Sequence, residues 1–182
     1  TPSTSSSARR RRKAPATPVP TDRRRMSEAQ PTRIAVLGAG SWGTALAGLL
    51  ASNGASVRLW ARDCEQAAAI DRQHQNPRYL PGVNLPDSLH AGCDLAAATE
   101  GAEQVWLVLP TKILGEFLAE HRETLPRSAV YVTASKGFEP GTGRRIDELV
   151  ADALGDVAFA VVSGPTFAIE VAHGRPAALA VG

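Results

Sequence analysis

The sequence predicts an α/β fold in which helices cover both faces of a mostly parallel sheet. From residue 33 onward, short apolar runs alternate with segments of helical pattern, which is typical of parallel sheets. A glycine cluster at residues 38–43 separates the first apolar run from an alanine-rich segment, as expected where a strand turns into a helix. The hydrophobic fraction of 43% is sufficient for a sizeable core.

Each element follows from a local pattern. A strand that is buried on both faces appears as a continuous apolar run, and turn residues mark its ends. Pro110 stops one such run, and the loop NPRYLPGVNLP at residues 76–86 is rich in turn residues. We expect strands at residues 34–37, 56–60, near Leu89, 105–109, 129–133, 157–162 and 177–181, and helices at residues 44–50, 63–74, 94–99, 112–122, 143–154 and 165–172.

Gly38, Gly40 and Gly43 form the pattern G-x-G-x-x-G between the first predicted strand and the first predicted helix. In this context the first glycine permits a tight turn, the second lets a pyrophosphate approach the backbone, and the third packs the helix on the strand. The unpaired amides of the first helical turn suit a phosphate. The motif predicts a dinucleotide site in a Rossmann-type, doubly wound sheet, with the Trp42 ring against the turn. The alternative is an ordinary turn with chance glycines.

The end of the second predicted strand carries the residues expected beside the adenosine ribose. An NAD-selective site places an acidic residue on the ribose 2′-hydroxyl. Arg62 stands at about that position instead, and a guanidinium can bind a 2′-phosphate through two hydrogen bonds. Asp63 is better placed as the N-cap of the next helix. The pattern favours NADP(H) over NAD, and a solvated Arg62 is the alternative.

Two further candidates stand at carboxyl ends of predicted strands, where open α/β sheets bind their ligands. Lys136 follows a buried strand, so we expect its ammonium to project into the crevice. Ser163-Gly164-Pro165-Thr166 forms a glycine turn before a helix, with Pro165 at the first helical position. Free amides and the Thr166 hydroxyl there predict a second anion site. A plain capping turn is the alternative.

Charge is distributed unevenly along the chain. Residues 1–25 hold eight basic residues and one acidic residue, a net charge of +7, and since the whole chain carries +2, the remainder carries −5. We predict that residues 1–32, which are basic and have little to bury, form a disordered tail, and that Met26 is the true start. A nucleic-acid partner would depend on this tail alone, so we expect none.

The remaining composition narrows the class of protein further. No apolar run approaches the roughly 18 residues that a membrane span needs. Cys64 and Cys93 are far apart in the sequence and form no C-x-x-C pair, which predicts buried or idle thiols in a reducing compartment. The four histidines show no metal-ligand spacing. We expect a cytoplasmic protein without a metal site.

Five segments in this order resemble the N-terminal domain of bacterial NAD(P)-dependent glycerol-3-phosphate dehydrogenase: GAGSWGTALA, WARD, NPRYLPGVNLP, ASKGFE and SGPTFAIEVAHGRP. The resemblance covers residues 33–182 and implies an NAD(P)-binding domain. It implies an oxidoreductase that transfers a hydride between NAD(P)H and dihydroxyacetone phosphate or sn-glycerol 3-phosphate, for phospholipid synthesis. The alternatives are another two-domain NADP-dependent reductase, of the ketopantoate or β-hydroxyacid type, and a non-catalytic NAD(P)-sensing module.

The resemblance also implies residue roles. Lys136 would contact both cofactor and substrate, while Gly164 and Thr166 would bind the substrate. The family's proton-transferring lysine lies in a helical C-terminal domain, which we expect after Gly182, so we expect no catalytic residue in this chain and little turnover from it alone. We expect NADPH to be the favoured cofactor and the whole enzyme to be a homodimer. The implied cofactor contacts beyond the three glycines are Ser41, Trp42, Arg62, Tyr79, Lys136 and Ala168.

Overall fold

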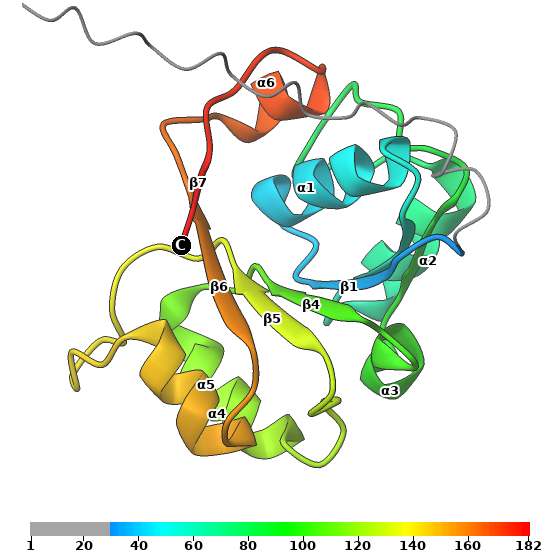
Figure 1. Cartoon of the computed structure of the whole chain (residues 1–182). Helices are drawn as coiled ribbons and strands as arrows, with labels where there is room; N and C mark the ends of the chain where they lie inside the picture. The colour runs from blue at the N-terminus through cyan, green and yellow to red at the C-terminus, as the bar shows by residue number, and fades with distance from the viewer. Residues whose placement is uncertain (1–29) are drawn as a thin grey trace, which may run out of the picture. The chain divides into compact units, whose positions relative to one another are not determined.

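The computed structural model describes residues 30–182. The start predicted at Met26 lies outside the described residues, as does all but the last part of the predicted basic tail. Within the described range, strands and helices alternate as the sequence predicts, from β1 to β7 (Figure 1).

The described residues form a seven-stranded sheet with the order β3-β2-β1-β4-β5-β6-β7. The chain runs outward from β1 through β2 to β3, returns to β4 on the other side of β1, and continues to β7. This is the doubly wound arrangement, in which ligands bind where the order reverses. β1 to β6 are parallel and β7 is antiparallel to β6. The strands are β1 Arg33–Leu37, β2 Ser56–Trp60, β3 Leu89–Gly92, β4 Gln104–Leu107, β5 Val130–Thr133, β6 Phe159–Ser163 and β7 Ala180–Val181.

Helices cover both faces of the sheet (Figure 1). One face packs against α1 Ser41–Ser52 and α2 Cys64–Gln73, and α6 Ala168–Ala172 packs on α1. The other face packs against α3 Leu95–Thr99, α4 Thr111–His121 and α5 Ile146–Leu154. Among residues 30–182, no helix has the length and apolar character required to cross a bilayer.

The two layers of core follow from the alternation of side chains along the strands. In β1, Ala35 and Leu37 are buried in the cluster with α4 and α5, whereas Ile34 and Val36 are buried in the cluster with α1 and α2. Successive side chains of a strand point to opposite faces, so a strand covered on both sides needs apolar residues at every position. The continuous apolar run of β1 therefore indicates a sheet that is covered on both faces.

The helix starts at the two predicted anion sites differ from the sequence prediction. α1 begins at Ser41, directly after Gly40, rather than at residue 44, so Gly43 lies inside its first turn. α6 begins at Ala168, and the prediction that Pro165 opens this helix is wrong. The amide of Thr166 donates to the carbonyl of Gly164, and Phe167 has an extended backbone. The chain thus makes a turn and an extended step before the helix starts.

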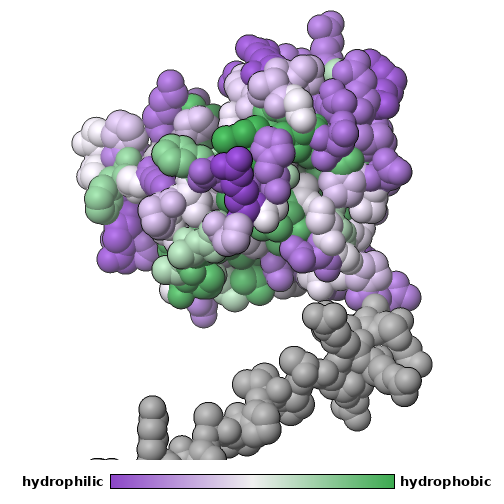
Figure 2. All heavy atoms as spheres, turned by 90° about the horizontal axis from the view of Figure 1, so that it is seen from above, coloured by the Kyte–Doolittle hydropathy of each residue, from purple (hydrophilic) through white to green (hydrophobic). Residues whose placement is uncertain are grey.

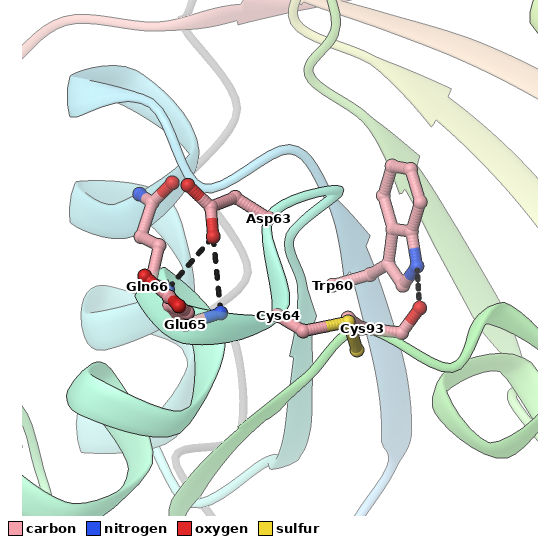
Figure 3. The surroundings of a disulfide bond; sticks show 6 residues. All are labelled: Trp60, Asp63, Cys64, Glu65, Gln66 and Cys93. Carbon is pink, nitrogen blue, oxygen red and sulfur yellow. Dashed lines mark hydrogen bonds between the residues drawn. A yellow bond between two sulfur atoms is a disulfide. The ribbon is translucent and has the colours of Figure 1, made fainter.

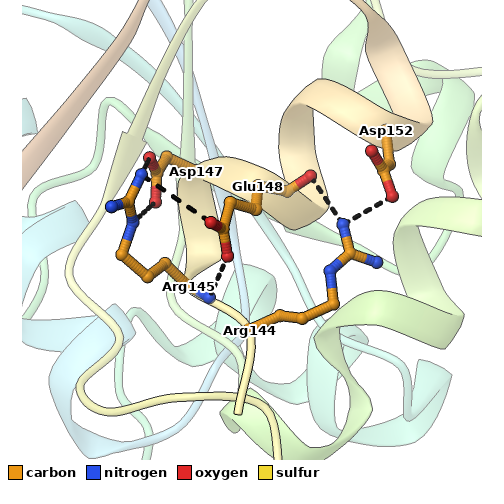
Figure 4. Close-up of polar contacts among 5 residues, drawn as sticks. All are labelled: Arg144, Arg145, Asp147, Glu148 and Asp152. Atoms are coloured by element: carbon orange, nitrogen blue, oxygen red, sulfur yellow. Dashed lines mark hydrogen bonds and ion pairs between the residues drawn. The ribbon is translucent and has the colours of Figure 1, made fainter. Parts of the chain in front are cut away.

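α5 begins at Ile146, later than the predicted residue 143, and charged side chains surround its first turn (Figure 4). The backbone amide of Arg145 donates to Glu148 Oε2 at 2.9 Å. Arg145 Nε donates to Asp147 Oδ1 at 2.9 Å, and this hydrogen bond is the main reason that the pKa of Asp147 lies below its ordinary value. These exposed contacts form a solvated charged face at the start of α5.

Candidate functional site

The three motif glycines fit together at the end of β1. Gly38 has a φ of +119°, its amide donates to the carbonyl of Trp60 at 3.0 Å, and a Cβ there would overlap the carbonyl oxygen of Val108. A Cβ on Gly43 would overlap the carbonyl oxygen of Gly38. A Cβ on Gly40, in contrast, would meet no atom within 4 Å. Two glycines are therefore required by packing, and the third leaves open space beside the turn.

The start of α1 is arranged to receive an anion. Its N-cap, Gly40, provides no side-chain hydrogen bond, and the first turn contains no acidic residue. The amides of the first turn of an α-helix have no intrahelical partner, and the helix dipole makes this end partially positive. An uncapped helix start beside the open space at Gly40 fits the pyrophosphate of a dinucleotide.

A buried asparagine fixes the neighbouring loop against this turn. Asn76 is 1% exposed, and its Nδ2 donates to the carbonyl of Ala39 at 3.0 Å and to Thr44 Oγ1 at 2.8 Å. Farther along the loop, the Ser41 hydroxyl donates to the backbone carbonyl of Tyr79 at 2.5 Å. Sequence reasoning missed Asn76, because an asparagine after a helix is a common turn residue and only its burial shows its role.

At the end of β2, Asp63 caps α2 as predicted (Figure 3). Its Oδ1 accepts hydrogen bonds from the amides of Glu65 and Gln66 at 3.0 and 3.2 Å. Arg62 is exposed at the same end of the sheet. Tyr79 is also exposed, and its backbone carbonyl contacts the start of α1. The structure thus brings Arg62 and Tyr79 to the region around the glycine turn.

Cys64 and Cys93 form a disulfide bond, which corrects the prediction of two idle thiols (Figure 3). β2 and β3 are parallel, with Trp60 opposite Gly92, so their carboxyl ends lie at the same edge. Cys64 opens α2 and Cys93 follows β3, and their Cα atoms are 5.0 Å apart. The indole N–H of Trp60 donates to the carbonyl of Cys93 at 3.0 Å. The disulfide links the start of α2 to the end of β3.

Lys136 and the glycine turn at Gly164 also meet. The ammonium of Lys136 donates to the carbonyl of Gly164 at 3.3 Å, although 28 positions separate the residues. A Cβ on Gly164 would overlap the carbonyl oxygen of Ala178, so a larger residue cannot replace this glycine without a shift of the backbone. Thr166 is half-buried, with its amide bonded to Gly164. Because α6 starts only at Ala168, Pro165 and Thr166 do not form the first turn of a helix, and the predicted anion site at such a turn is not present here.

A cavity of about 360 Å³ opens beside Lys136. It lies between the ends of β5 and β6 and the start of α5, with both polar and apolar walls. The exposed ring of Phe138 forms part of its wall. The cavity is lined by Thr133, Ser135, Lys136, Gly137, Phe138, Arg145, Ile146, Asp147, Phe159, Val161 and Ser163.

The last residue, Gly182, lies beside this cavity. Its amide donates to the carbonyl of Val161 at 3.1 Å, and its carbonyl accepts a hydrogen bond from the amide of Val161 at 2.8 Å. Val161 belongs to β6 and lines the cavity, so β7 brings Gly182 to the edge of the sheet there (Figure 1). The proton-transferring lysine that the resemblance places after Gly182 lies outside the described residues, and its role stays a prediction.

Trp42 belongs to the residues around the glycine turn, and Ala168 follows the Gly164 turn that Lys136 contacts. Both pack against the core cluster that includes α1 and α2, and α6 lies on α1. Ala168 follows shortly after the turn at Gly164, so the chain passes from the Lys136 region into α6, which packs on α1. On the face seen from above, hydrophilic and apolar side chains are interspersed (Figure 2).

The glycine turn, Arg62, Lys136 and Gly164 all follow parallel strands closely, so these predicted site residues lie at the carboxyl ends of the strands.

Comparison with known proteins gives consistent results. Residues 33–182 match the family model described as the N-terminus of NAD-dependent glycerol-3-phosphate dehydrogenase. A glycerol-3-phosphate dehydrogenase [NAD(P)+] from Stenotrophomonas maltophilia (strain R551-3) is 53% identical over 150 residues, which are 82% of this chain and 44% of the relative. One from Xanthomonas campestris pv. campestris (strain B100) is 50% identical over the same lengths. The chain thus spans less than half the length of these curated relatives.

The solved structures agree with the sequence relatives. A glycerol-3-phosphate dehydrogenase from Coxiella burnetii superimposes with a TM-score of 0.78 at 38% identity, covering 83% of this chain and 46% of that one. A glycerol-3-phosphate dehydrogenase from Saccharomyces cerevisiae gives a TM-score of 0.71 at 26% identity, covering 79% and 45%. The family model, the identities and the shared fold lead to one assignment. This chain belongs to the family of the N-terminal domain of NAD-dependent glycerol-3-phosphate dehydrogenase.

Proposed function

We propose that this chain is the coenzyme-binding part of an enzyme that transfers a hydride between NAD(P)H and dihydroxyacetone phosphate or sn-glycerol 3-phosphate. The observation that carries the proposal is the convergence of Lys136 on the Gly164 turn, at the same edge of the sheet as the uncapped start of α1. A coenzyme site alone does not require a cation at this second place. We infer the substrate from the relatives, which are named glycerol-3-phosphate dehydrogenase.

The proposal assigns a role to each part of the site. The turn at Gly38, Gly40 and Gly43 holds the pyrophosphate, and the cofactor, when bound, supplies the hydride. Lys136 contacts both cofactor and substrate and provides positive charge near the oxygen that gains charge when the ketone is reduced. Gly164 and Thr166 bind the substrate. The remaining cofactor contacts are Ser41, Trp42, Arg62, Tyr79 and Ala168.

The proposal extends to the whole enzyme. The proton-transferring lysine belongs to the part of the enzyme that residues 30–182 do not include, and the exposed apolar side chains of Phe138 and Phe167 offer a surface on which that part can pack. NADPH is the favoured cofactor, because the exposed Arg62 follows β2 at the position expected for a contact with the ribose 2′-phosphate. The enzyme is a homodimer that feeds phospholipid synthesis, and the net negative charge beyond residue 25 argues against a nucleic-acid partner.

Binding tests the proposal directly. We expect the purified chain to bind NADPH and NADH, with quenching of tryptophan fluorescence and a higher melting temperature, because ligands that bind only the folded state stabilise it. We expect negligible turnover of dihydroxyacetone phosphate by this chain alone. If neither dinucleotide changed the fluorescence or the melting temperature, the proposed function would be wrong.

A further inference from the structure

Arg78 lies beside the predicted ribose end of the site, but neither the glycine motif nor the resemblance assigns it a role. Its Nη1 is 3.8 Å from Asp63 Oδ2, and its guanidinium carbon lies 5.1 Å from the centre of the Tyr79 ring. Asp63 directly follows Arg62 in the sequence. The Arg78 guanidinium therefore lies near the carboxylate of the residue that follows Arg62, at the end of β2.

The fold holds Arg78 at this position. Two residues earlier in the same loop, Asn76 is buried and bonded to the glycine turn, and the next residue, Tyr79, accepts a hydrogen bond from Ser41 through its carbonyl. The loop is thus attached to the coenzyme turn on both sides of Arg78. The cation–π contact with Tyr79 limits the orientations of the guanidinium further.

The surroundings of Asp63 show why a second cation is needed. Asp63 Oδ1 accepts hydrogen bonds from two amides of α2, while Oδ2 faces Arg78. A carboxylate beside a ribose repels a 2′-phosphate unless a cation neutralises it. A guanidinium has five N–H donors, so an arginine that faces Asp63 retains donors for a phosphate. The ion pair is exposed, and exposed pairs contribute little to folding, so the fold alone does not explain the arrangement.

We propose that Arg78 is a coenzyme-specificity residue, which together with Arg62 contacts the 2′-phosphate of NADPH. This inference rests on the proposed function, because it requires that the dinucleotide binds along the turn at Gly38–Gly43. It adds a second phosphate contact at the end of β2, where the sequence assigns only Arg62. In this arrangement, Asp63 and Tyr79 hold Arg78 in place before the coenzyme arrives.

The test measures dissociation constants of NADPH, NADH, 2′,5′-ADP and 5′-ADP for the unmodified chain and for Arg78→Ala. We expect the substitution to weaken NADPH and 2′,5′-ADP about tenfold, since hydrogen bonds to charged groups are among the stronger ones. Binding of NADH and 5′-ADP should change less than twofold. Arg72→Ala is the matched control: it removes another exposed arginine, which lies roughly 14 Å along α2 from Asp63. That control should leave all four constants unchanged.

A double variant separates direct contact from neutralisation of Asp63. If Arg78 only cancels the charge of Asp63, then Asp63→Asn in the Arg78→Ala background restores NADPH affinity, and that result would overturn the proposal. We expect the double variant to stay weak. Equal losses for NADPH and NADH, or unchanged NADPH binding in Arg78→Ala, would also overturn it. Failure of the unmodified chain to bind either dinucleotide would instead refute the proposed function.

Discussion

The ammonium of Lys136 lies 3.3 Å from the carbonyl oxygen of Gly164, and parallel pairing of β5 with β6 accounts for this contact. Thr133 pairs with Val161, so the segments that follow the two strands leave the sheet at the same edge. Lys136 therefore reaches the Gly164 turn because of strand register rather than proximity in the sequence. The functional predictions below concern residues at the carboxyl ends of these parallel strands.

An activity measurement on Lys136→Ala tests whether Lys136 contributes to catalysis. We expect kcat/KM for dihydroxyacetone phosphate to fall about 100-fold, as it does when one group that stabilises developing charge is removed. The assay uses a chimera that joins residues 33–182 to the remaining part of the Stenotrophomonas maltophilia relative. Lys112→Ala is the matched control, because Lys112 is exposed at the start of α4. An unchanged kcat/KM in Lys136→Ala would remove Lys136 from the site.

The glycines of the turn should separate into two classes. Gly43→Ala places a Cβ on the carbonyl oxygen of Gly38, so we expect the free energy of unfolding to fall by about 3 kcal/mol. Gly40→Ala meets no atom within 4 Å and has an ordinary φ of −76°, so its melting temperature should hardly change. Its NADPH affinity should nevertheless fall at least tenfold, because the methyl group enters the space proposed for the pyrophosphate. Urea unfolding and fluorescence titration measure the two effects, and normal NADPH binding in Gly40→Ala would contradict this placement.

An acidic residue at position 62 should change the cofactor preference. Arg62 is exposed at the end of β2, and a carboxylate there repels a 2′-phosphate and can accept a hydrogen bond from a ribose hydroxyl. We expect Arg62→Asp to weaken NADPH binding at least tenfold and NADH binding far less. Titration with both dinucleotides measures the ratio. Equal weakening of the two would show that Arg62 does not contact the 2′-phosphate.

Reduction of the disulfide should lower stability. The disulfide closes a loop between residues 29 positions apart, and a bridge of that span contributes about 3 kcal/mol by restricting the unfolded chain. We expect Cys64→Ser together with Cys93→Ser to lower the free energy of unfolding by a similar amount, with the oxidised chain as the reference. Dithiothreitol should destabilise the unmodified chain and leave the double variant unaffected. Two titratable thiols in the chain unfolded without reductant would disprove the bond.

Local patterns predicted most of the elements. Asp63 was identified as a helix cap because the cap and its amide partners lie within three residues of one another. The glycine turn is predictable because the three glycines, the strand before them and the helix after them all lie within one short segment of the sequence. The apolar run of β1 predicts two covered faces, since a strand buried on both sides is apolar at nearly every position.

The features that were missed depend on contacts between distant segments. The Cys64–Cys93 bond requires the register of β2 against β3, which neither cysteine indicates locally. Asn76 looks like a turn residue, and its role appears only when the loop folds back onto Ala39. Pro165 suits the first position of a helix, but the Thr166 amide donates to the carbonyl of Gly164 and α6 starts only after the extended Phe167. In each case the local sequence is compatible with more than one structure, and contacts in the folded chain show which one forms.

Tyr131 should make the fold sensitive to alkaline pH. Burial raises the pKa of Tyr131 above its ordinary value of 10.0, and the nearby charge of Arg127 opposes the shift only in part. Above about pH 10 the unfolded chain loses the phenolic proton while the native state keeps it, so the free energy of unfolding should fall by up to about 1.4 kcal/mol per pH unit. Below that pH the phenol is protonated in both states and contributes no slope.

Tyr131→Phe checks this prediction, with urea unfolding measured between pH 8 and pH 11. The variant should lose about 1 kcal/mol at pH 8, because the Tyr131 hydroxyl donates to the carbonyl of Pro126 at 3.0 Å. Its stability should then decline less steeply with pH than that of the unmodified chain. The sequence has two tyrosines, and the other, Tyr79, is exposed, so Tyr79→Phe is the control and should keep the steep decline. The same alkaline slope in Tyr131→Phe would show that another group causes it.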